Sequence, residues 1–347
     1  MAPGGRAIVV WLRSDGETQR VLARSFSPAG VPGPVVRLSP PGPHVSLKPP
    51  QVGVAANGTA TVMWQERGRL RARVWPASGS PGAVRTVVRS PRRSWRLAVG
   101  ARGRAVVVWQ SRARTRLRPR ELHARWLSVA GSPGRVTALG APGEELPPWS
   151  TPQVAVAASG RAVVAWLAYD GDRVRARARG LTAAGAPGPL VDISGARRIE
   201  ADPHVGIDAA GNAIVAWTDQ SEDGSHQGVR ARRLPARGRT GRSFAVFSGR
   251  PFAFGAQVGM TPDGRTVFAW GSAGAIVEDA PGDNRVQIRT RAVDGTLGPV
   301  MTVSDAADAD SGSAAQLAVA ANGSAALTWE IGFGLGRNWR ARGAAIP

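Results

Sequence analysis

The 347-residue sequence contains no cysteine, one lysine (Lys48) and one tyrosine (Tyr169). Without cysteine the chain can form no disulfide, no thiolate metal site and no cysteine nucleophile. No apolar run approaches the roughly 20 residues that a membrane-spanning helix needs, and no secretory apolar segment follows Met1. Strongly helical stretches are also absent, so the pattern that remains to be explained is one of short β-strands.

Positive charge dominates what is present, with 45 Lys and Arg against 24 Asp and Glu and a net charge of +21. All but one of these basic residues are arginine, whose guanidinium stays ionised at any physiological pH. We therefore expect the protein to favour anionic partners and to resist self-association, remaining a monomer.

A repeat built on glycine and tryptophan runs through the whole chain. Seven tryptophans follow an apolar run, and a glycine lies six residues before each of them. The tryptophans are Trp11, Trp64, Trp109, Trp166, Trp217, Trp270 and Trp329. The glycines are Gly5, Gly58, Gly103, Gly160, Gly211, Gly264 and Gly323. The intervals of 45 to 59 residues between tryptophans suit a propeller blade, because most solenoid repeats are shorter.

Each repeat is predicted to form four short strands, a to d. Strand a, as at 51–54, alternates large apolar residues with Gly or Ala, which lets a neighbouring sheet approach closely. An Asn-Gly or Asp-Gly type of turn then supplies the positive φ of a two-residue hairpin. Strand b, as at 105–109, is apolar at every position, so we expect it to be covered on both faces. Strand d is short and follows a turn of the Gly-x-Pro-Gly type.

Strand c of every repeat ends in an Ala-Arg or Thr-Arg pair. The arginines are Arg24, Arg73, Arg125, Arg179, Arg232, Arg291 and Arg342. Because a binding site is usually asymmetric whereas a scaffold residue recurs, we expect cation–π or carboxylate contacts between blades here and no ring of ligands. By the same argument the seven repeated tryptophans are core residues.

Small antiparallel sheets that are covered on both faces stack radially as blades. The sequence therefore predicts an all-β, seven-bladed β-propeller of four-stranded antiparallel blades, forming a single domain over residues 1–347. We expect the first and last blades to be incomplete, blade one lacking its strand a and blade seven its strand d. One upstream segment of roughly 30 residues could supply both strands, and a secretory signal before it would place the protein outside the cell.

The repeat resembles that of bacterial β-propeller proteins with an apolar–Gly–apolar–Trp blade motif. More distantly it is similar to the sialidase-type propellers, whose blades carry an Asp-box between the third and fourth strands. The c–d turn occupies that place here, but the chain contains no Ser-x-Asp-x-Gly-x-Thr-Trp segment. The resemblance implies the propeller fold and leaves the function open, because propellers host many functions.

On an up-and-down blade the b–c and d–a loops share one face, which we call the loop face. These loops vary in length, and variable loops on a rigid scaffold are where function usually lies. Blade three concentrates arginine there, in its incoming d–a loop, which also holds Arg89, and in its b–c loop. The candidate ligand-binding residues are Arg92, Arg93, Trp95, Arg96, Arg112, Arg114, Arg116, Arg118 and Arg120. A solvated arginine-rich loop without a ligand is the alternative.

Two tryptophans outside the repeated position, Trp95 and Trp149, fall in or near d–a loops and could stack on a ligand. The four histidines are scattered, and we interpret them as structural or surface residues. Asp305, Asp308 and Asp310 resemble a calcium loop in composition but match no EF-hand spacing. We therefore predict no metal site and no cofactor.

The function that these patterns favour is a non-catalytic binding or interaction scaffold, with an anionic polymer or a glycan as the partner on the loop face. The alternative is a sialidase-like glycosidase or another polysaccharide-acting glycosidase or lyase. A sialidase mechanism would need Tyr169, a glutamate, an acid aspartate and three arginines to converge. Asp170 lies beside Tyr169, but no glutamate is near it in sequence. Whether these side chains meet in space discriminates between the two hypotheses.

Overall fold

The computed structural model describes residues 5–16, 18–42, 49–89, 91–111, 120–171, 173–195, 198–199, 201–220, 227–249, 252–273, 285–304, 313–320, 322–331 and 340–346. These residues form strands joined by turns, without a helix among them. The chain divides into two compact units, Met1–Ala162 with Gly180–Gly188 and Val163–Arg179 with Pro189–Pro347.

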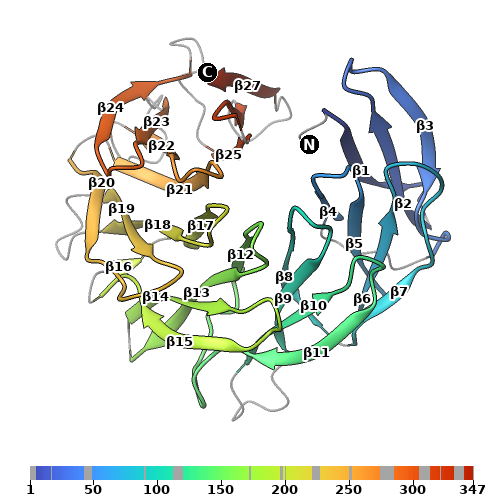
Figure 1. Ribbon diagram of the computed structural model, residues 1–347, viewed down its shortest axis with the longest axis horizontal. Helices are drawn as coiled ribbons and strands as arrows, with labels where there is room; N and C mark the ends of the chain where they lie inside the picture. Colours follow the sequence, from blue (N-terminus) through green and yellow to red (C-terminus); the bar gives the residue numbers. More distant parts are fainter. Residues whose placement is uncertain are drawn as a thin grey trace. The chain divides into compact units, whose positions relative to one another are not determined.

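Antiparallel sheets follow one another in chain order (Figure 1). The first three are β1 (Ala7–Ser14), β2 (Gln19–Phe26) and β3 (Pro32–Arg37); β4 (Gln51–Val54), β5 (Ala60–Glu66), β6 (Arg69–Trp75) and β7 (Arg85–Arg89); and β8 (Pro91–Val99), β9 (Ala105–Ser111), β10 (Leu122–Leu127) and β11 (Pro133–Ala138). The fourth sheet, whose strands are divided between the units, is β12 (Gln153–Val156), β13 (Ala162–Asp170), β14 (Arg173–Leu181) and β15 (Pro187–Asp192).

The second unit holds the remaining three sheets. They are β16 (Arg198–Ile199), β17 (His204–Ile207), β18 (Ala213–Gln220), β19 (Gln227–Leu234) and β20 (Ser243–Phe247); β21 (Phe252–Met260), β22 (Thr266–Ala273), β23 (Arg285–Arg291) and β24 (Leu297–Thr302); and β25 (Ser313–Val319), β26 (Ala325–Ile331) and β27 (Arg340–Ile346). The first and last sheets thus have three strands each, and β16 and β17 pair with successive parts of β18.

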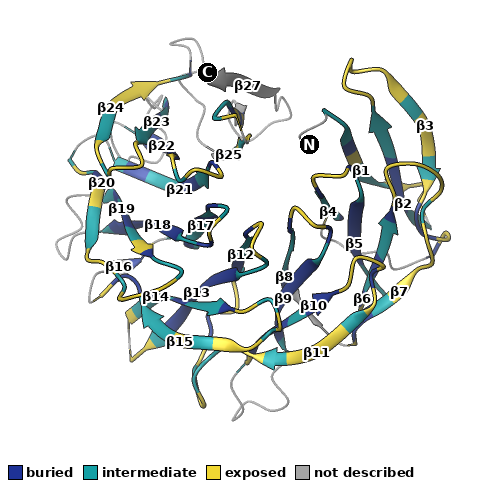
Figure 2. Ribbon diagram, viewed as in Figure 1, coloured by how far each residue is buried: buried dark blue, intermediate teal, exposed yellow. Residues whose placement is uncertain are grey.

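The strands that carry the repeated tryptophan are the core of their sheets (Figure 2). In β5, β9, β13, β18 and β22 every residue up to the tryptophan is buried, which confirms the prediction of cover on both faces. β26 instead alternates buried and exposed positions over 325–329, whereas in β1 only Ile8 is buried and Trp11 is partly exposed. Strand d is the exposed edge, as in β3 and β11.

The glycine six residues before each tryptophan has a positive φ in all seven repeats, between 79° and 99°. The turn differs from the predicted two-residue hairpin, however. The amide of Gly58 donates to the carbonyl of Ala55, and the amide of Ala55 donates to the carbonyl of Thr59, which leaves a three-residue loop over 56–58. Only the glycine has a positive φ there, so a type I turn followed by a glycine bulge forms.

Small residues in strand a let neighbouring sheets approach closely, as predicted. A Cβ atom placed on Gly53 would collide with the side chain of Val99 at the end of β8. One placed on Gly206 would lie 2.9 Å from Cγ of Met260 in β21. Glutamine side chains span the same seam, because the amide group of Gln51 bonds to both the carbonyl of Trp95 and the amide of Leu97, at 3.2 and 2.9 Å.

Candidate functional site

The recurrent arginine of strand c is a structural clamp. Nε of Arg125 donates to the carbonyl of Gly134 across the c–d hairpin, and its Nη1 donates to the carbonyl of Val87 in the preceding sheet. Arg73, Arg232 and Arg289 repeat this double contact. The expected contact between blades is therefore confirmed, but its acceptors are backbone carbonyls and not the predicted carboxylates or rings.

Two members of the predicted arginine series were assigned to the wrong register. In the sheet of β21–β24 the clamp is Arg289, which pairs with Phe268, whereas Arg291 pairs with Thr266. In the last sheet Arg342 pairs with Trp329, and Ala344 occupies the clamp position. The cation–π contacts come mainly from the a–b turn, where Arg6 lies 5.3 Å from the ring centre of Trp75.

A groove of about 650 Å³ opens between β7 and the sheet of β8–β11. Its lining comprises Thr86, Val87, Val88, Arg89, Trp109, Ser111, His123, Arg125, Pro133 and Val136. Two arginines and a histidine line it, and none of these ten residues is acidic. Ser111 also ends β9, and the arginine-rich segment 112–119, which lies outside the described residues, follows it in sequence.

His123 occupies the middle of this lining. Its ring lies 5.4 Å from that of Trp109, centre to centre, and its Nε2 is 3.4 Å from Oε2 of Glu121. Burial lowers the pKa of His123 below its ordinary value of 6.5, and the Glu121 carboxylate opposes this in part. The imidazole is therefore neutral at pH 7 and becomes a further cation only on acidification.

The structure corrects the predicted placement of the first arginine group. Arg92, Arg93 and Arg96 lie in strand β8 and not in a d–a loop, because β8 begins at Pro91, which pairs with Ser111. A register shift between Pro91 and Trp95 accommodates this extra length. The sequence pattern does not indicate this shift, so the start of β8 could not be predicted. The pairing nevertheless brings Pro91 at the start of β8 opposite Ser111 at the end of β9, and Ser111 is the residue that precedes the second arginine group in sequence.

Trp95 is not available to a ligand. Its side chain is 0% exposed and packs with Met63, Leu70 and Trp109 between two sheets, so the interpretation of this ring as a stacking platform is wrong. Arg120 is described and donates from Nη1 to the carbonyl of Leu146 at 3.3 Å. Arg112, Arg114, Arg116 and Arg118 lie outside the described residues.

The loop between β11 and β12 joins the same surface. The carbonyl of Ser150 accepts hydrogen bonds from Oγ of Ser94 at 2.6 Å and from Nε2 of Gln110 at 3.1 Å. Together with the bond between Arg120 and Leu146, these contacts hold the loop between β11 and β12 against β8, against the end of β9 and against the start of β10. This is the arrangement expected of a loop face.

Sequence reasoning missed His123 as part of the groove, although a signal was present. The residue that pairs with the repeated tryptophan is Arg71, Arg230 or Gln287 in three other sheets and His123 in this one. Leu22 in the first sheet and Gln287 also depart from arginine at this position, so the departure marks His123 as one of three candidates.

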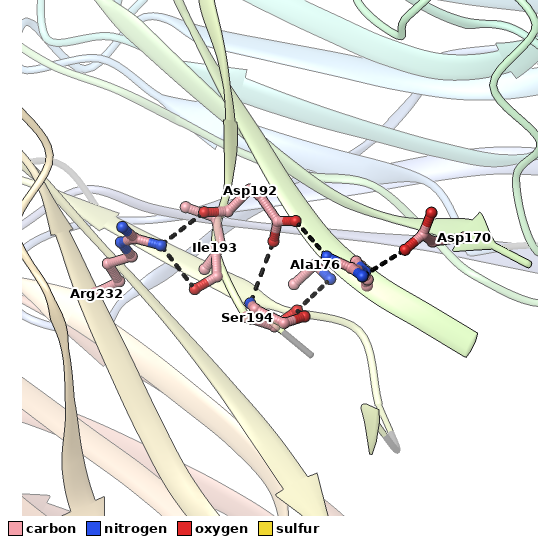
Figure 3. A network of polar contacts seen from close by, with 8 residues as sticks. Asp170, Ala176, Asp192, Ile193, Ser194 and Arg232 are labelled. Carbon is pink, nitrogen blue, oxygen red and sulfur yellow. Dashed lines mark hydrogen bonds and ion pairs between the residues drawn. The ribbon is translucent and has the colours of Figure 1, made fainter. Parts of the chain in front are cut away.

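The surroundings of Tyr169 do not assemble the sialidase constellation. Within the described residues no hydrogen bond or ion pair joins Tyr169 to a glutamate or an arginine. The neighbouring Asp170 instead pairs with Arg175, which also bonds to Asp192 at 3.0 Å (Figure 3). Arg232 binds the carbonyl of Asp192, so this network joins β15 of the fourth sheet to β19 of the fifth through residues of the second unit.

Among the described residues no three His, Asp or Glu side chains come close enough to hold a metal ion. Asp305, Asp308 and Asp310, the segment with a calcium-like composition, are not among them. The described part of the chain also contains no helix of the length and apolarity that a membrane span requires.

Comparisons with known proteins identify the fold of this chain but do not assign it to a family. No protein-family profile matches the sequence, and no curated protein matches it. The polysaccharide lyase Uly1 is similar in structure with a TM-score of 0.54 and 8% identity, over 98% of this chain and 87% of its own. A protein of unknown function from Dyadobacter fermentans has a TM-score of 0.53 and 11% identity, over 98% of both chains.

An α-L-arabinanase from Penicillium chrysogenum, solved with arabinobiose, has a TM-score of 0.49 and 12% identity, over 86% of this chain and 92% of its own. Such low identities bear on the fold alone. Together with the successive antiparallel sheets, the likeness to the first two structures defines a multi-bladed β-propeller. This fold is shared by polysaccharide-acting enzymes and by proteins of unknown function.

Proposed function

We propose that the protein is a non-catalytic binding module that holds an anionic polymer or an acidic glycan in the groove between β7 and the sheet of β8–β11. The observation that carries the proposal is the lining of this groove, in which Arg89, Arg125 and His123 stand without an acidic residue. At about 650 Å³ the groove has the size of an ordinary ligand pocket, and several ligand oxygens could reach its donors.

The charge distribution extends this site beyond the groove. Arg112, Arg114, Arg116 and Arg118 follow Ser111 in sequence, and we expect their guanidinium groups to add to the binding of a polymer that enters the groove. Guanidinium forks bind carboxylate, sulfate and phosphate oxygens in pairs. Such contacts depend on the charge and planar shape of the ligand group, so we expect the protein to discriminate little between anionic polymers.

Binding of this kind releases counterions and is therefore steeply sensitive to salt. The test is retention on heparin of the wild type and of a variant with Arg89, Arg112, Arg114, Arg116 and Arg118 all changed to Ser. Arg120 is kept because it holds the neighbouring loop. We expect the variant to elute at clearly lower salt than the wild type.

The matched control removes the same charge elsewhere. Arg102, Arg135, Arg237, Arg239 and Arg242 are exposed, and they lie on or beside the a–b and c–d turns, away from the loop face. Changing these five to Ser should leave elution close to that of the wild type. Equal elution of the two five-arginine variants would show that only net charge matters, and the groove would then not be a site.

A further inference from the structure

Trp149 is the one aromatic residue among the exposed large apolar side chains of the described residues, with 55% of its surface accessible. It lies in the loop between β11 and β12, which is one of the d–a loops that form the loop face. A single exposed apolar residue needs no explanation in itself. What distinguishes Trp149 is the way in which the chain on either side of it is held.

Buried polar groups fix the backbone around this ring. Ser94, Gln110 and Ser150 are all buried, and the first two donate to the carbonyl of Ser150, directly after Trp149. Gln110 also reaches the carbonyl of Pro147 at 3.4 Å. Together these bonds hold the backbone on either side of Trp149 while its ring is exposed to solvent. The backbone that carries the ring therefore has little conformational freedom left to lose on binding.

The same loop builds a small cavity. It measures about 190 Å³ and is lined by Arg120, Glu121, Leu122, Ala138, Gly140, Ala141, Pro142, Gly143 and Glu144. At about 30 Å³ for each water molecule this is room for roughly six waters, the scale of one monosaccharide unit. Arg120 joins the cavity to the tryptophan side of the loop through its bond to the carbonyl of Leu146.

The chemistry of this cavity differs from that of the groove. One guanidinium and the two carboxylates of Glu121 and Glu144 line it, so it offers both donors and acceptors and has no excess of positive charge. Carboxylates repel a polyanion but accept hydrogen bonds from hydroxyl groups. Trp149 is not part of this lining, but it follows Leu146 by three residues in the same loop. An aromatic face that acts together with donors and acceptors suits a ligand with an apolar face and a hydroxylated rim.

We propose that Trp149 and the cavity of Arg120, Glu121 and Glu144 bind a neutral sugar unit of a glycan. The C–H face of the sugar ring packs on the indole, and its hydroxyls exchange hydrogen bonds with the arginine and the carboxylates. The inference deepens the proposed function, since it makes the partner a glycan, but it rests on its own residues and can fail independently.

The experiment is a panel of neutral cello-, xylo-, manno- and arabino-oligosaccharides of four to six units, with titration calorimetry on those that bind. We expect at least one to bind, Trp149→Ala to weaken it tenfold or more, Trp149→Phe to keep most of the affinity, and Glu144→Gln to weaken it less than the alanine variant. Val129→Ala, which trims an exposed side chain in a c–d turn, serves as the control and should leave the affinity unchanged.

The two proposals are separated by a second readout on the same proteins. Trp149→Ala should elute from heparin with the wild type, and the variant lacking Arg89, Arg112, Arg114, Arg116 and Arg118 should keep its oligosaccharide affinity. If no neutral oligosaccharide binds, or if Trp149→Ala binds as the wild type does with an unchanged circular dichroism spectrum, the sugar site is refuted whatever the heparin result.

Discussion

Arg125 in β10 donates from Nη1 to the carbonyl oxygen of Val87 in β7 at 2.6 Å, and so one side chain joins two neighbouring sheets. The same guanidinium group bonds to Gly134 within its own sheet. A charged donor that satisfies carbonyls on both sides of a seam is stronger than a neutral one, because charge-assisted hydrogen bonds are shorter and more favourable. This explains why the position recurs in several sheets, independently of the groove that Arg125 also lines.

We predict that Arg232→Met destabilises the protein by about 2–3 kcal/mol, since hydrogen bonds to a charged group contribute about 1.5–3 kcal/mol each. Arg232 bonds to Gly241 in its own sheet and to Asp192 in the preceding one. The control is Arg233→Met, at an exposed position next in sequence. Urea unfolding followed by circular dichroism compares the two, and equal midpoints would contradict the assignment of a clamp.

The second prediction concerns the repeated tryptophan. Trp166 is 1% exposed in β13, and its replacement by alanine should cost roughly 3–5 kcal/mol, as large-to-small changes in cores do. Trp11 occupies the same repeat position but is partly exposed in β1, so Trp11→Ala should cost clearly less. The measurement is again the shift of the urea midpoint, and a wild-type midpoint for Trp166→Ala would remove the basis for the strand assignment.

The repeat made the core strands predictable because both of their faces are buried. The run Ala105–Trp109 is apolar throughout, and it falls within β9. The seam glutamines could also have been found, since Gln51, Gln153, Gln257 and Gln316 each lie thirteen residues before a repeated tryptophan. Their role depends on reaching the next sheet, as the bond from Leu97 to Gln51 shows.

The candidate site was less predictable, for two physical reasons. Irregular register in a strand leaves no compositional trace, so Arg92, Arg93 and Trp95 were assigned to a loop although β8 contains them. The groove also depends on packing between sheets, which brings Arg89 of one sheet to His123 of the next. A sequence repeat predicts strands within a blade, whereas the residues that line a seam come from two blades.

A double-mutant cycle tests the close approach of neighbouring sheets. Gly53→Ala places a methyl group against the side chain of Val99, and overpacking of this kind costs typically 1–3 kcal/mol. Val99→Ala removes the obstructing atoms at a cost of its own. We expect the double variant to be more stable than the sum of the two single effects predicts, by at least 0.5 kcal/mol, which is the range for residues in contact. Additive effects would show that the two residues do not touch.

The last prediction follows from the burial of His123, which lowers its pKa below 6.5 in the folded protein. As the pH falls below 6.5 the unfolded chain takes up this proton first, so folding stability decreases and levels off once the pH is below the folded pKa of His123. The variant His123→Gln should lack this part of the pH dependence. Comparing urea midpoints of the two proteins between pH 7.5 and 5.5 cancels the contribution of the carboxylates, which both share.

Ligand binding should have the opposite effect on the pKa of His123 from burial. A polyanion in the groove favours the charged imidazole, so it raises the pKa of His123 and should bind more tightly as the pH falls from 7.5 to 5.5. The other charged residues that line the groove are arginines, so His123 is the lining residue whose charge changes over this pH range. We expect the salt needed to elute the wild type from heparin to rise more steeply on acidification than that of His123→Gln. Parallel pH profiles for the two proteins would place the bound anion away from His123.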